Sequence, residues 1–483
     1  MRTLIWFRQD LRLADNPALT AALTGSSAVI PVYLHAPAED GAWSPGAASN
    51  WWLHHSLAAL QAELRARGSD LVLRTSQDSA AELLTIARSS GAERILWNRR
   101  YEPAAIARDA RIKVALRQHG IAAESYNGTL LREPWEIKTQ NGGPCQVFTP
   151  FWRHCLALAD PAEPGAAPAR IPAPDRWPAS SSLDGLELLP RINWTHGMSA
   201  AWQPGAGPAQ ARLQQFLTEG ISQYAQRRDR PDMSATSGLS PHLHFGEISP
   251  RQIWHAVREH AALTDNNAAR PDAPWRTSKF LAEIGWREFS YHLMYHFPET
   301  PERPLRPAFA RFPWNNDAVQ LRAWQRGLTG YPIVDAGMRQ LWRTGWMHNR
   351  VRMITASFLV KHLRIDWKAG ARWFWDTLVD ADLASNTQGW QWSAGCGADA
   401  APYFRIFNPM TQGRKFDESG VYVRQWVPEL AHLSNDWIHE PWAAPASDLR
   451  EAGVTLGNSY PLPIVDHIVA RNAALDALAS LKN

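Results

Sequence analysis

The stretch LVDADLASNTQGWQW, residues 378–392, places two aspartates, Asp380 and Asp382, among apolar side chains, amides and tryptophans. A carboxylate is costly to remove from water unless it is paired or hydrogen-bonded. We therefore expect a cation, a hydrogen-bond donor or a bound group beside these two acids, and the neighbouring segments indicate which.

A second segment, GWMHNRVRMITASF (345–358), mixes side-chain types on one helical face. Trp346, Asn349, Arg350 and Met353 stand at positions i, i+3, i+4 and i+7 of that face. Because core faces are usually Leu, Ile and Val, this mixture favours contact with a ligand. A buried, hydrogen-bonded asparagine is the alternative.

A third segment, KFLAEIGWREFSYHL (279–293), shows a polar face at helical spacing. Glu283, Trp286, Arg287 and Ser290 fall on that face, while apolar residues lie towards the other side. The face is either a solvated stripe or the wall of a pocket, and helical spacing alone does not decide between them.

Residues 224–249, YAQRRDRPDMSATSGLSPHLHFGEIS, join an aromatic residue, an arginine cluster and a run of small residues. The hydroxyls and backbone N–H groups of residues 236–240 are able to wrap a phosphate. A loop that caps the next helix is the alternative, and the residues taken alone favour it.

Residues 397–417, GADAAPYFRIFNPMTQGRKFD, carry Arg405, Arg414 and Lys415, with Gln412 in an expected loop. Arginines beside exposed aromatic residues suit a nucleic-acid backbone with unstacked bases.

The N-terminal part of the chain alternates short apolar runs with helical stretches. Strands are expected at 3–7, 28–35, 70–75, 94–99 and 123–127, and helices at 49–68 and 79–91. Such alternation predicts a doubly wound parallel sheet in an α/β domain. No G-x-G-x-x-G follows a strand. We expect the α/β domain over 1–131, an interdomain linker rich in Pro, Ala, Gly and Ser over 132–208, and a large all-α domain over 209–483.

The composition is that of an ordinary globular protein. The net charge of +4 and pI near 9.0 are only a weak indication of nucleic-acid binding. Apolar runs are too short to cross a membrane. Three scattered cysteines, Cys145, Cys155 and Cys396, indicate the reducing cytoplasm and cannot supply a four-cysteine metal site. The 25 tryptophans are mostly expected in the core.

Together these segments resemble the cryptochrome/photolyase family, and within it the bacterial class I DNA photolyases that repair cyclobutane pyrimidine dimers. The resemblance extends from IWFRQDLRLADNPAL (5–19) to PIVDH (463–467). Its most specific stretches are TGYPIVDAGMRQL, GWMHNRVRM, DADLASNTQGWQW and APYFRIFNP. It implies an α/β domain followed by a helical domain that binds FAD and DNA.

The resemblance also implies which residues hold FAD. Asp380 and Asp382 would lie against the isoalloxazine and adenosine parts, with a fork from Arg352 on Asp380, and Asn386 would face flavin N5. The implied cofactor residues are Tyr224, Thr236, Ser237, Gly238, Leu239, Ser240, Arg352, Asp380, Ala381, Asp382 and Asn386.

By the same resemblance, Glu283 bonds to the thymine edge of a flipped-out dimer. Trp286 and Trp392 form aromatic walls, and Asn349 and Met353 complete the lining. The remaining implied residues are the DNA contacts Arg228, Arg287 and Gln412 and the tryptophan chain Trp390, Trp367 and Trp314, which passes electrons to the flavin.

The implied reaction is light-driven repair of UV-damaged DNA. Excited FADH⁻ donates an electron, the cyclobutane ring splits, and the electron returns. Folate-binding members often carry an Asn-Glu pair where this chain has Ala104 and Ala105, so a second chromophore of folate or deazaflavin type stays unassigned. We expect a monomer with no metal and no obligate protein partner.

Four alternatives compete with repair of cyclobutane dimers. A (6-4) photolyase carries two histidines at the positions of Asn349 and Met353, and neither is histidine here. A cryptochrome photoreceptor often has a long C-terminal tail, whereas this sequence ends soon after its last expected helix. A single-strand-binding protein would not need Asp380, Asp382 or Arg352. The iron–sulfur branch is disfavoured by the three cysteines.

Overall fold

The computed structural model describes residues 1–263, 267–399 and 404–482. The chain forms two compact units. Unit 1 comprises Met1–Ser222 and Ser237–Pro298, and unit 2 comprises Gln223–Thr236 and Glu299–Asn483. The expected α/β domain and linker both fall in unit 1, together with residues 209–222 and 237–298 of the expected all-α domain.

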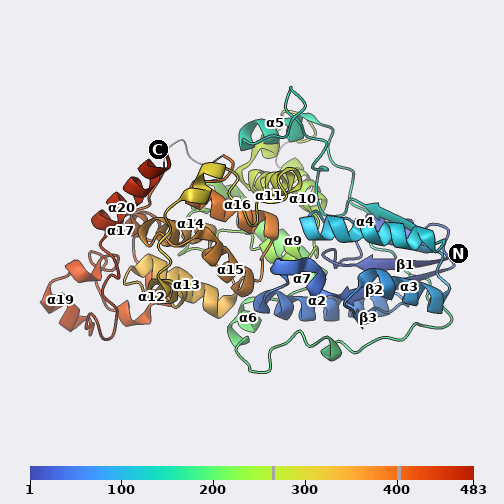
Figure 1. Cartoon of the computed structure of the whole chain (residues 1–483), viewed down its shortest axis with the longest axis horizontal. Helices are drawn as coiled ribbons and strands as arrows, with labels where there is room; N and C mark the ends of the chain where they lie inside the picture. Colours follow the sequence, from blue (N-terminus) through green and yellow to red (C-terminus); the bar gives the residue numbers. More distant parts are fainter. Residues whose placement is uncertain (264–266, 400–403, 483) are drawn as a thin grey trace. The chain divides into compact units, whose positions relative to one another are not determined.

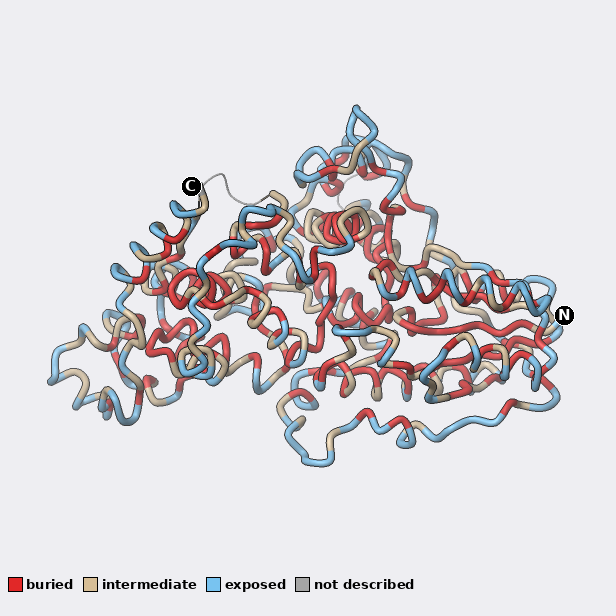
Figure 2. The backbone as a smooth tube through the Cα atoms, in the orientation of Figure 1, coloured by how far each residue is buried: buried red, intermediate tan, exposed pale blue. Residues whose placement is uncertain are grey.

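Unit 1 is built on a five-stranded parallel sheet (Figure 1). The strands are β1 (Arg2–Phe7), β2 (Ala28–His35), β3 (Val72–Thr75), β4 (Arg94–Asn98) and β5 (Ala122–Tyr126), in the order β3-β2-β1-β4-β5. β1 is buried along residues 3–7 (Figure 2), as a central strand between two helical layers must be. The doubly wound parallel sheet predicted from the sequence is confirmed.

Helices cover this sheet. Leu4 and Trp6 pack with side chains of α3 (Ser79–Ser90) and α4 (Pro103–Gln118) in one apolar cluster. α3 begins at the side-chain cap of Asp78 and ends at Gly91, which adopts φ +66° as the sequence indicated. Further helices of unit 1 are α1 (Pro17–Leu23), α2 (Ala47–Arg65), α5 (Phe148–Ala157), α6 (His196–Ala201), α7 (Ala206–Glu219), α9 (Ser240–His244), α10 (Pro250–Ala262) and α11 (Lys279–His296).

The proline-rich linker lies along the sheet rather than away from it. The backbone N–H of Ser181 donates to the Leu73 carbonyl of β3 at 2.8 Å, and the Leu73 N–H donates to Ser180 Oγ at 2.9 Å. The linker thereby covers the outer edge of β3, which would otherwise expose unpaired backbone groups.

Unit 2 is helical (Figure 1). α15 packs closely on α16 because Gly370 lets the ring of Trp390 approach, and a Cβ at that glycine would lie 2.1 Å from Trp390 Cη2. The elements of unit 2 include α8 (Tyr224–Arg227), α12 (Ala318–Gln325), α13 (Pro332–Thr344), α14 (Asn349–Ser357), the π-helical turn η6 (Phe358–His362), α15 (Trp367–Thr377), α16 (Leu383–Ala394), α17 (Pro409–Phe416), α18 (Val421–Trp426), α19 (Ala446–Glu451) and α20 (His467–Ala479).

The conspicuous motif TGYPIVDAGMRQL has a structural explanation. The buried carboxylate of Asp335 accepts hydrogen bonds from Thr329 N at 2.7 Å, Gly330 N at 3.0 Å and the hydroxyl of Tyr460 at 2.7 Å. Asp335 therefore ties the start of α13 to the segment before α20. Within the described ranges, no helix has the length and apolar composition needed to cross a membrane.

Candidate functional site

The predicted ion pair between Asp380 and Arg352 is present in unit 2. Arg352 Nη2 lies 2.8 Å from Asp380 Oδ2 and 3.0 Å from Oδ1, and the aspartate side chain is only 4% exposed. The expected two-nitrogen fork is wrong, because Arg352 Nε instead donates to the Met347 carbonyl at 2.7 Å. One guanidinium nitrogen thus serves the carboxylate, and another anchors the arginine to the chain before α14.

Asp382 and Asn386 are fixed by the first turn of α16. The Asp382 side chain accepts from Ser385 N at 2.7 Å and is the N-cap of the helix. One turn on, Asn386 Nδ2 donates to the Ala371 carbonyl of α15 at 3.0 Å. Since its amide nitrogen is committed there, the half-buried side chain of Asn386 offers its oxygen as a hydrogen-bond acceptor. Ala381, between the two acids, is buried.

The donor set of these residues fits a reduced flavin. Fully reduced flavin carries an N–H at N5, which needs an acceptor, and Asn386 supplies one. The Arg352–Asp380 pair supplies a cation and an anion at fixed positions, and Asp380 stands two residues before Asp382, the N-cap of α16. The chemistry of the residues present therefore agrees with the predicted role of this segment, while each individual assignment to FAD stays a prediction.

The three predicted electron-transfer tryptophans show a gradient of exposure. Trp390 and Trp367 are each 2% exposed, whereas Trp314 is partly exposed. Trp390 rests on Gly370, one turn after Trp367 on α15. The residue after Trp314, Asn315, donates its N–H to the Arg364 carbonyl at 2.6 Å, just before α15. The fold thus brings all three to the same part of unit 2.

The prediction of one mixed helical face over residues 346–353 is wrong for Trp346. α14 begins at Asn349 with His348 as its N-cap, so Trp346 precedes the helix. Arg350 pairs with Asp229 at 2.9 Å and lies over the ring of Phe416 at 4.5 Å. Asn349 is exposed.

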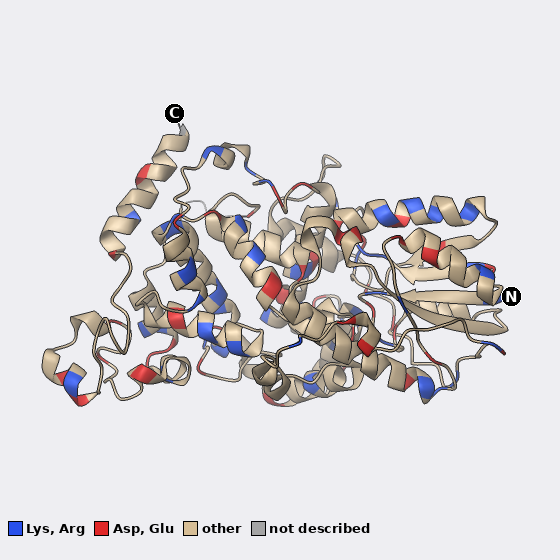
Figure 3. Cartoon of the chain, turned by 60° about the horizontal axis from the view of Figure 1, so that its bottom comes forward, with Lys and Arg blue, Asp and Glu red and all other residues tan. Residues whose placement is uncertain are grey.

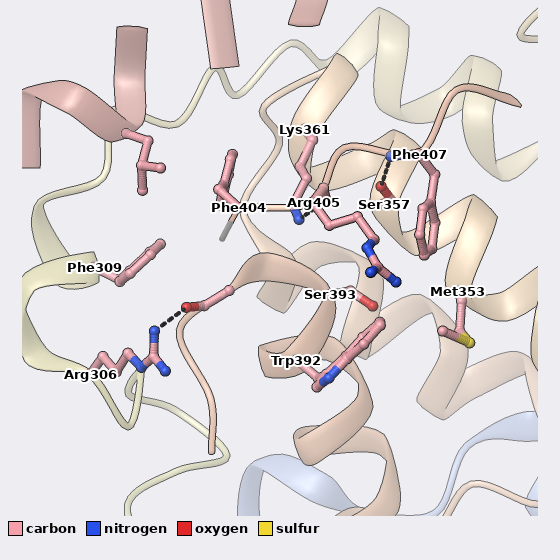
Figure 4. A pocket seen from close by; sticks show the side chains of 12 residues that line it. Arg306, Phe309, Met353, Ser357, Lys361, Trp392, Ser393, Phe404, Arg405 and Phe407 are labelled. Carbon is pink, nitrogen blue, oxygen red and sulfur yellow. Dashed lines mark hydrogen bonds between the residues drawn. The ribbon is translucent and has the colours of Figure 1, made fainter. Parts of the chain in front are cut away.

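Met353 and Trp392 do come together, at a cavity of about 160 Å³ within unit 2 (Figure 4). Met353 projects from α14 and Trp392 from α16, and Arg405 directs its guanidinium towards Trp392 (Figure 4). Ser393, Phe407 and Lys361 also line the cavity. Of the predicted lesion-binding side chains, Met353 and Trp392 thus line one cavity, and their contact with a lesion stays a prediction. The first part of the APYFRIFNP motif, residues 401–403, lies outside the described residues.

The expectation that Gln412 lies in a loop is wrong. Gln412 is part of α17, which starts at Pro409 with Asn408 as a side-chain cap. The Asn-Pro pair was the signal available in the sequence. Arg414 of the same helix pairs with Glu440 at 2.6 Å. A DNA contact by Gln412 stays a prediction.

In unit 1, α11 carries Glu283, Trp286 and Arg287. Glu283 and Trp286 are half-buried, and Trp286 stacks on Phe148 of α5 with ring centroids 3.8 Å apart and an interplanar angle of 8°. Phe148 was missed from the sequence, because the two rings are far apart in the chain. Ser290, expected on the same face, is buried and donates to the Trp286 carbonyl at 2.9 Å.

Arg287 is held by unit 1 itself. Its Nη1 donates to the Thr129 carbonyl at 2.9 Å, its guanidinium lies over Tyr291 at 4.9 Å, and its side chain is 11% exposed. These contacts favour a role in fixing α11 to the end of the α/β domain, and its contact with DNA stays a prediction.

The predicted phosphate loop crosses the division between the two units, since Thr236 belongs to unit 2 and residues 237–240 to unit 1. Gly238 has φ +62°, and a Cβ there would lie 2.6 Å from Arg212 Nη1, so only glycine fits. Leu239 N donates to Ser237 Oγ at 3.4 Å, and Ser240 starts α9. Tyr224, a buried residue of unit 2, lies 5.5 Å from the guanidinium of Arg228.

Charge is dispersed over the chain. Lys and Arg occur together with Asp and Glu across the chain (Figure 3), in keeping with the net charge of only +4. A DNA contact by Arg228 stays a prediction.

The chain is similar to known proteins over nearly its whole length. Residues 3–174 match the family described as DNA photolyase, and residues 280–480 match the FAD binding domain of DNA photolyase. The deoxyribodipyrimidine photo-lyase of Agrobacterium fabrum is 50% identical over 483 residues, covering 99% of this chain and 98% of the relative. Cryptochrome-1 of Arabidopsis thaliana is 42% identical, covering 99% of this chain and 70% of the relative.

A solved structure is also similar: a bacterial class III photolyase from Agrobacterium tumefaciens, with a TM-score of 0.94 and 49% identity, covering 100% of this chain and 98% of that one. The chain belongs to the DNA photolyase and cryptochrome family. It contains that family's FAD-binding domain in its C-terminal half. Assignment to class I stays a prediction, since this similar structure is of class III.

Proposed function

We propose that this protein is a light-driven DNA repair enzyme that splits cyclobutane pyrimidine dimers. The observation that carries the proposal is the arrangement of Arg352, Asp380 and Asn386, a fixed ion pair beside a half-buried amide acceptor, with Trp390 buried one turn further along α16. Bound FAD in its reduced, anionic form supplies the electron that opens the cyclobutane ring and takes it back.

The protein residues then have three tasks. Asn386 accepts a hydrogen bond and has no ionisable proton, so it does not protonate the group it contacts. Arg352 and Asp380 together add almost no net charge, yet their opposite charges at fixed positions produce a constant electric field around them. Trp390, Trp367 and Trp314 lead from the interior to the surface, which suits re-reduction of an oxidised cofactor.

Lesion choice follows from the cavity wall. Met353 and Trp392 offer apolar surface to a cyclobutane ring at the cavity, and the exposed Asn349, one turn before Met353 on α14, offers an amide to base edges. The adjacent histidine, His348, accepts from Arg350 N through Nδ1 at 3.2 Å, and burial lowers its pKa to about 4. It is therefore neutral at physiological pH and unsuited to supply the proton that a (6-4) lesion requires.

A cryptochrome-like signalling function is the second candidate, because identity to Cryptochrome-1 of Arabidopsis thaliana reaches 42% over almost the whole chain. By family resemblance, plant-type receptors carry an acid at the position of Asn386. The amide here favours repair.

Two variants test the proposal by separating binding from chemistry. Glu283→Ala should lower the repair yield per absorbed photon more than it lowers affinity for dimer-containing DNA. Arg228→Ala should weaken affinity and its salt dependence by about one phosphate contact and leave the yield of bound substrate nearly unchanged. Equal loss of both quantities in both variants, or an undiminished yield in Glu283→Ala, would overturn the proposed pocket.

A further inference from the structure

A buried lysine stands at the cavity that Met353 and Trp392 line. Lys361, in the π-helical turn η6, is 4% exposed. Its Nζ donates to the carbonyl of Arg405 and lies 4.3 Å from the centroid of the Phe404 ring. Among the described residues that line the cavity, none is Asp or Glu. Burial, and secondly the charge of Arg405, lower the pKa of Lys361 to about 7.

Lys361 bonds to the segment 404–407, which a second hydrogen bond also holds in place. Phe407 N donates to Ser357 Oγ at 3.4 Å, and Ser357 precedes Lys361 by four residues on the same helical face. Residues 404–407 are therefore held at two points, the carbonyl of Arg405 and the N–H of Phe407. The guanidinium of Arg405 is directed towards Trp392 and Ser393 (Figure 4).

A lysine at this position is energetically unfavourable if its only role is to bond to the Arg405 carbonyl. A neutral amide or hydroxyl could bond to the same carbonyl without placing an ammonium group in a poorly solvated site. The π-helical turn that carries Lys361 is an uncommon conformation, seen chiefly at functional sites. Both features indicate that the amine serves the cavity as well as the fold.

We propose that Lys361 is a positioning residue for lesion binding: it fixes the backbone of Arg405 so that the guanidinium stands beside Trp392, where it binds a phosphate next to the dimer. This inference rests on the proposed repair function. Besides Arg405, the titratable or charged groups near the amine are Cys396, Arg306 across the cavity, and His362 on η6.

A double-mutant cycle tests the coupling. The affinity of the FAD-loaded protein for an oligonucleotide with one cyclobutane dimer is measured for the wild type, Lys361→Met, Arg405→Ala and the double variant. Each single change should weaken binding by about tenfold, the worth of one charge-assisted hydrogen bond, and the double variant should bind no more weakly than Arg405→Ala. Repair yield of bound substrate should stay unchanged.

Two further variants serve as controls. Lys361→Arg retains the positive charge and the hydrogen-bond donor, and the cavity provides space for the longer side chain. This variant should therefore retain most of the affinity for dimer-containing DNA. Lys368→Met removes a 40% exposed lysine of unit 2 and should bind as the wild type does. Additive losses in the double variant would overturn the proposal, because Lys361 would then act independently of Arg405.

A pH series tests the same idea without altering Lys361. The affinity advantage of wild type over Arg405→Ala should shrink as pH rises through about 7, since the neutral amine is the weaker donor. A constant advantage from pH 6 to 8.5 would contradict the positioning role. If the wild type itself does not distinguish dimer-containing from undamaged DNA, the proposed function fails instead, and the two failures are thus separable.

Discussion

Two buried carboxylates, Asp380 in unit 2 and Glu288 in unit 1, are satisfied in different ways. Asp380 bonds directly to the guanidinium of Arg352 at 2.8 Å. Glu288, 1% exposed, accepts the backbone N–H groups of Leu131 and Arg132 at 2.9 and 3.1 Å, and its closest cation, Arg287, is 3.6 Å away. Burial raises the pKa of Glu288 to about 7.

This difference distinguishes a carboxylate suited to a cofactor site from one with a structural role. A buried acid bonded to a cation retains a fixed field that a cofactor can use, whereas a buried acid bonded to backbone amides ties two chain segments together. Glu288 ties α11 to the end of the α/β domain, whereas Asp380 has the ion pair expected of the acid that we propose for the cofactor site.

The largest expected effect comes from breaking the ion pair. Arg352→Met leaves a buried carboxylate without its cation and should lower the free energy of unfolding by about 3–5 kcal/mol. Bound flavin should be lost in the same variant. Denaturant unfolding followed by tryptophan fluorescence, together with the flavin absorbance of the purified protein, measures both quantities.

The double variant Arg352→Met with Asp380→Asn distinguishes the two roles. With neither charge buried, most of the stability should return, yet flavin binding should not. Full flavin occupancy in the stable double variant would show that the pair serves only the fold.

The second expected effect concerns Glu288 and pH. The folded state retains the proton of this carboxyl up to about pH 7, whereas the unfolded state loses it near 4.5. Wild-type stability should therefore fall as pH rises from about 5 to 7, by on the order of 3 kcal/mol from this group, and Glu288→Gln should remove that part of the slope. Unfolding curves across this pH range provide the measurement, with the exposed Glu259→Gln as matched control. Parallel slopes in all three proteins would refute the anchoring role.

The sequence predicted the parts of the fold that depend on local pattern. The five strands follow apolar runs bounded by loops, and the pairing of Asp380 with Arg352 followed from family resemblance. Trp346 was wrongly assigned to the helical face because helical spacing does not say where a helix begins. His348 is the N-cap of α14, so Trp346 precedes the helix. The stack of Phe148 on Trp286 and the bond from Lys361 to Arg405 depend on tertiary contacts between distant segments, which no periodicity reveals.

A smaller effect on stability, with a large effect on photochemistry, is expected at Trp390. Trp390→Phe removes part of a buried ring that packs on Gly370 and should cost about 1–2 kcal/mol of unfolding free energy. Photoreduction of oxidised flavin should be lost because phenylalanine is much harder to oxidise, while repair with chemically reduced flavin should persist. Illumination of the oxidised protein with an external reductant, followed by flavin absorbance, measures this. Normal photoreduction would exclude Trp390 from the electron path.

The smallest stability change is expected at Asp382. Asp382→Ser retains a side-chain cap for α16, so the free energy of unfolding should change by less than about 1 kcal/mol. Flavin affinity should nevertheless fall, because the carboxylate is gone. Titration of the apoprotein with FAD compares the two proteins, and unchanged affinity would limit Asp382 to helix capping.

The most direct measurement is repair of single lesions under blue light. Purified protein with reduced flavin is given one oligonucleotide with a single cyclobutane dimer and another with a single (6-4) product, and restoration of intact pyrimidines is followed against a dark control. Light-dependent repair of the cyclobutane dimer alone is the predicted result, since Asn349, Met353 and neutral His348 supply no proton. Repair of the (6-4) product, or no repair of either lesion by the flavin-loaded protein, would contradict the account.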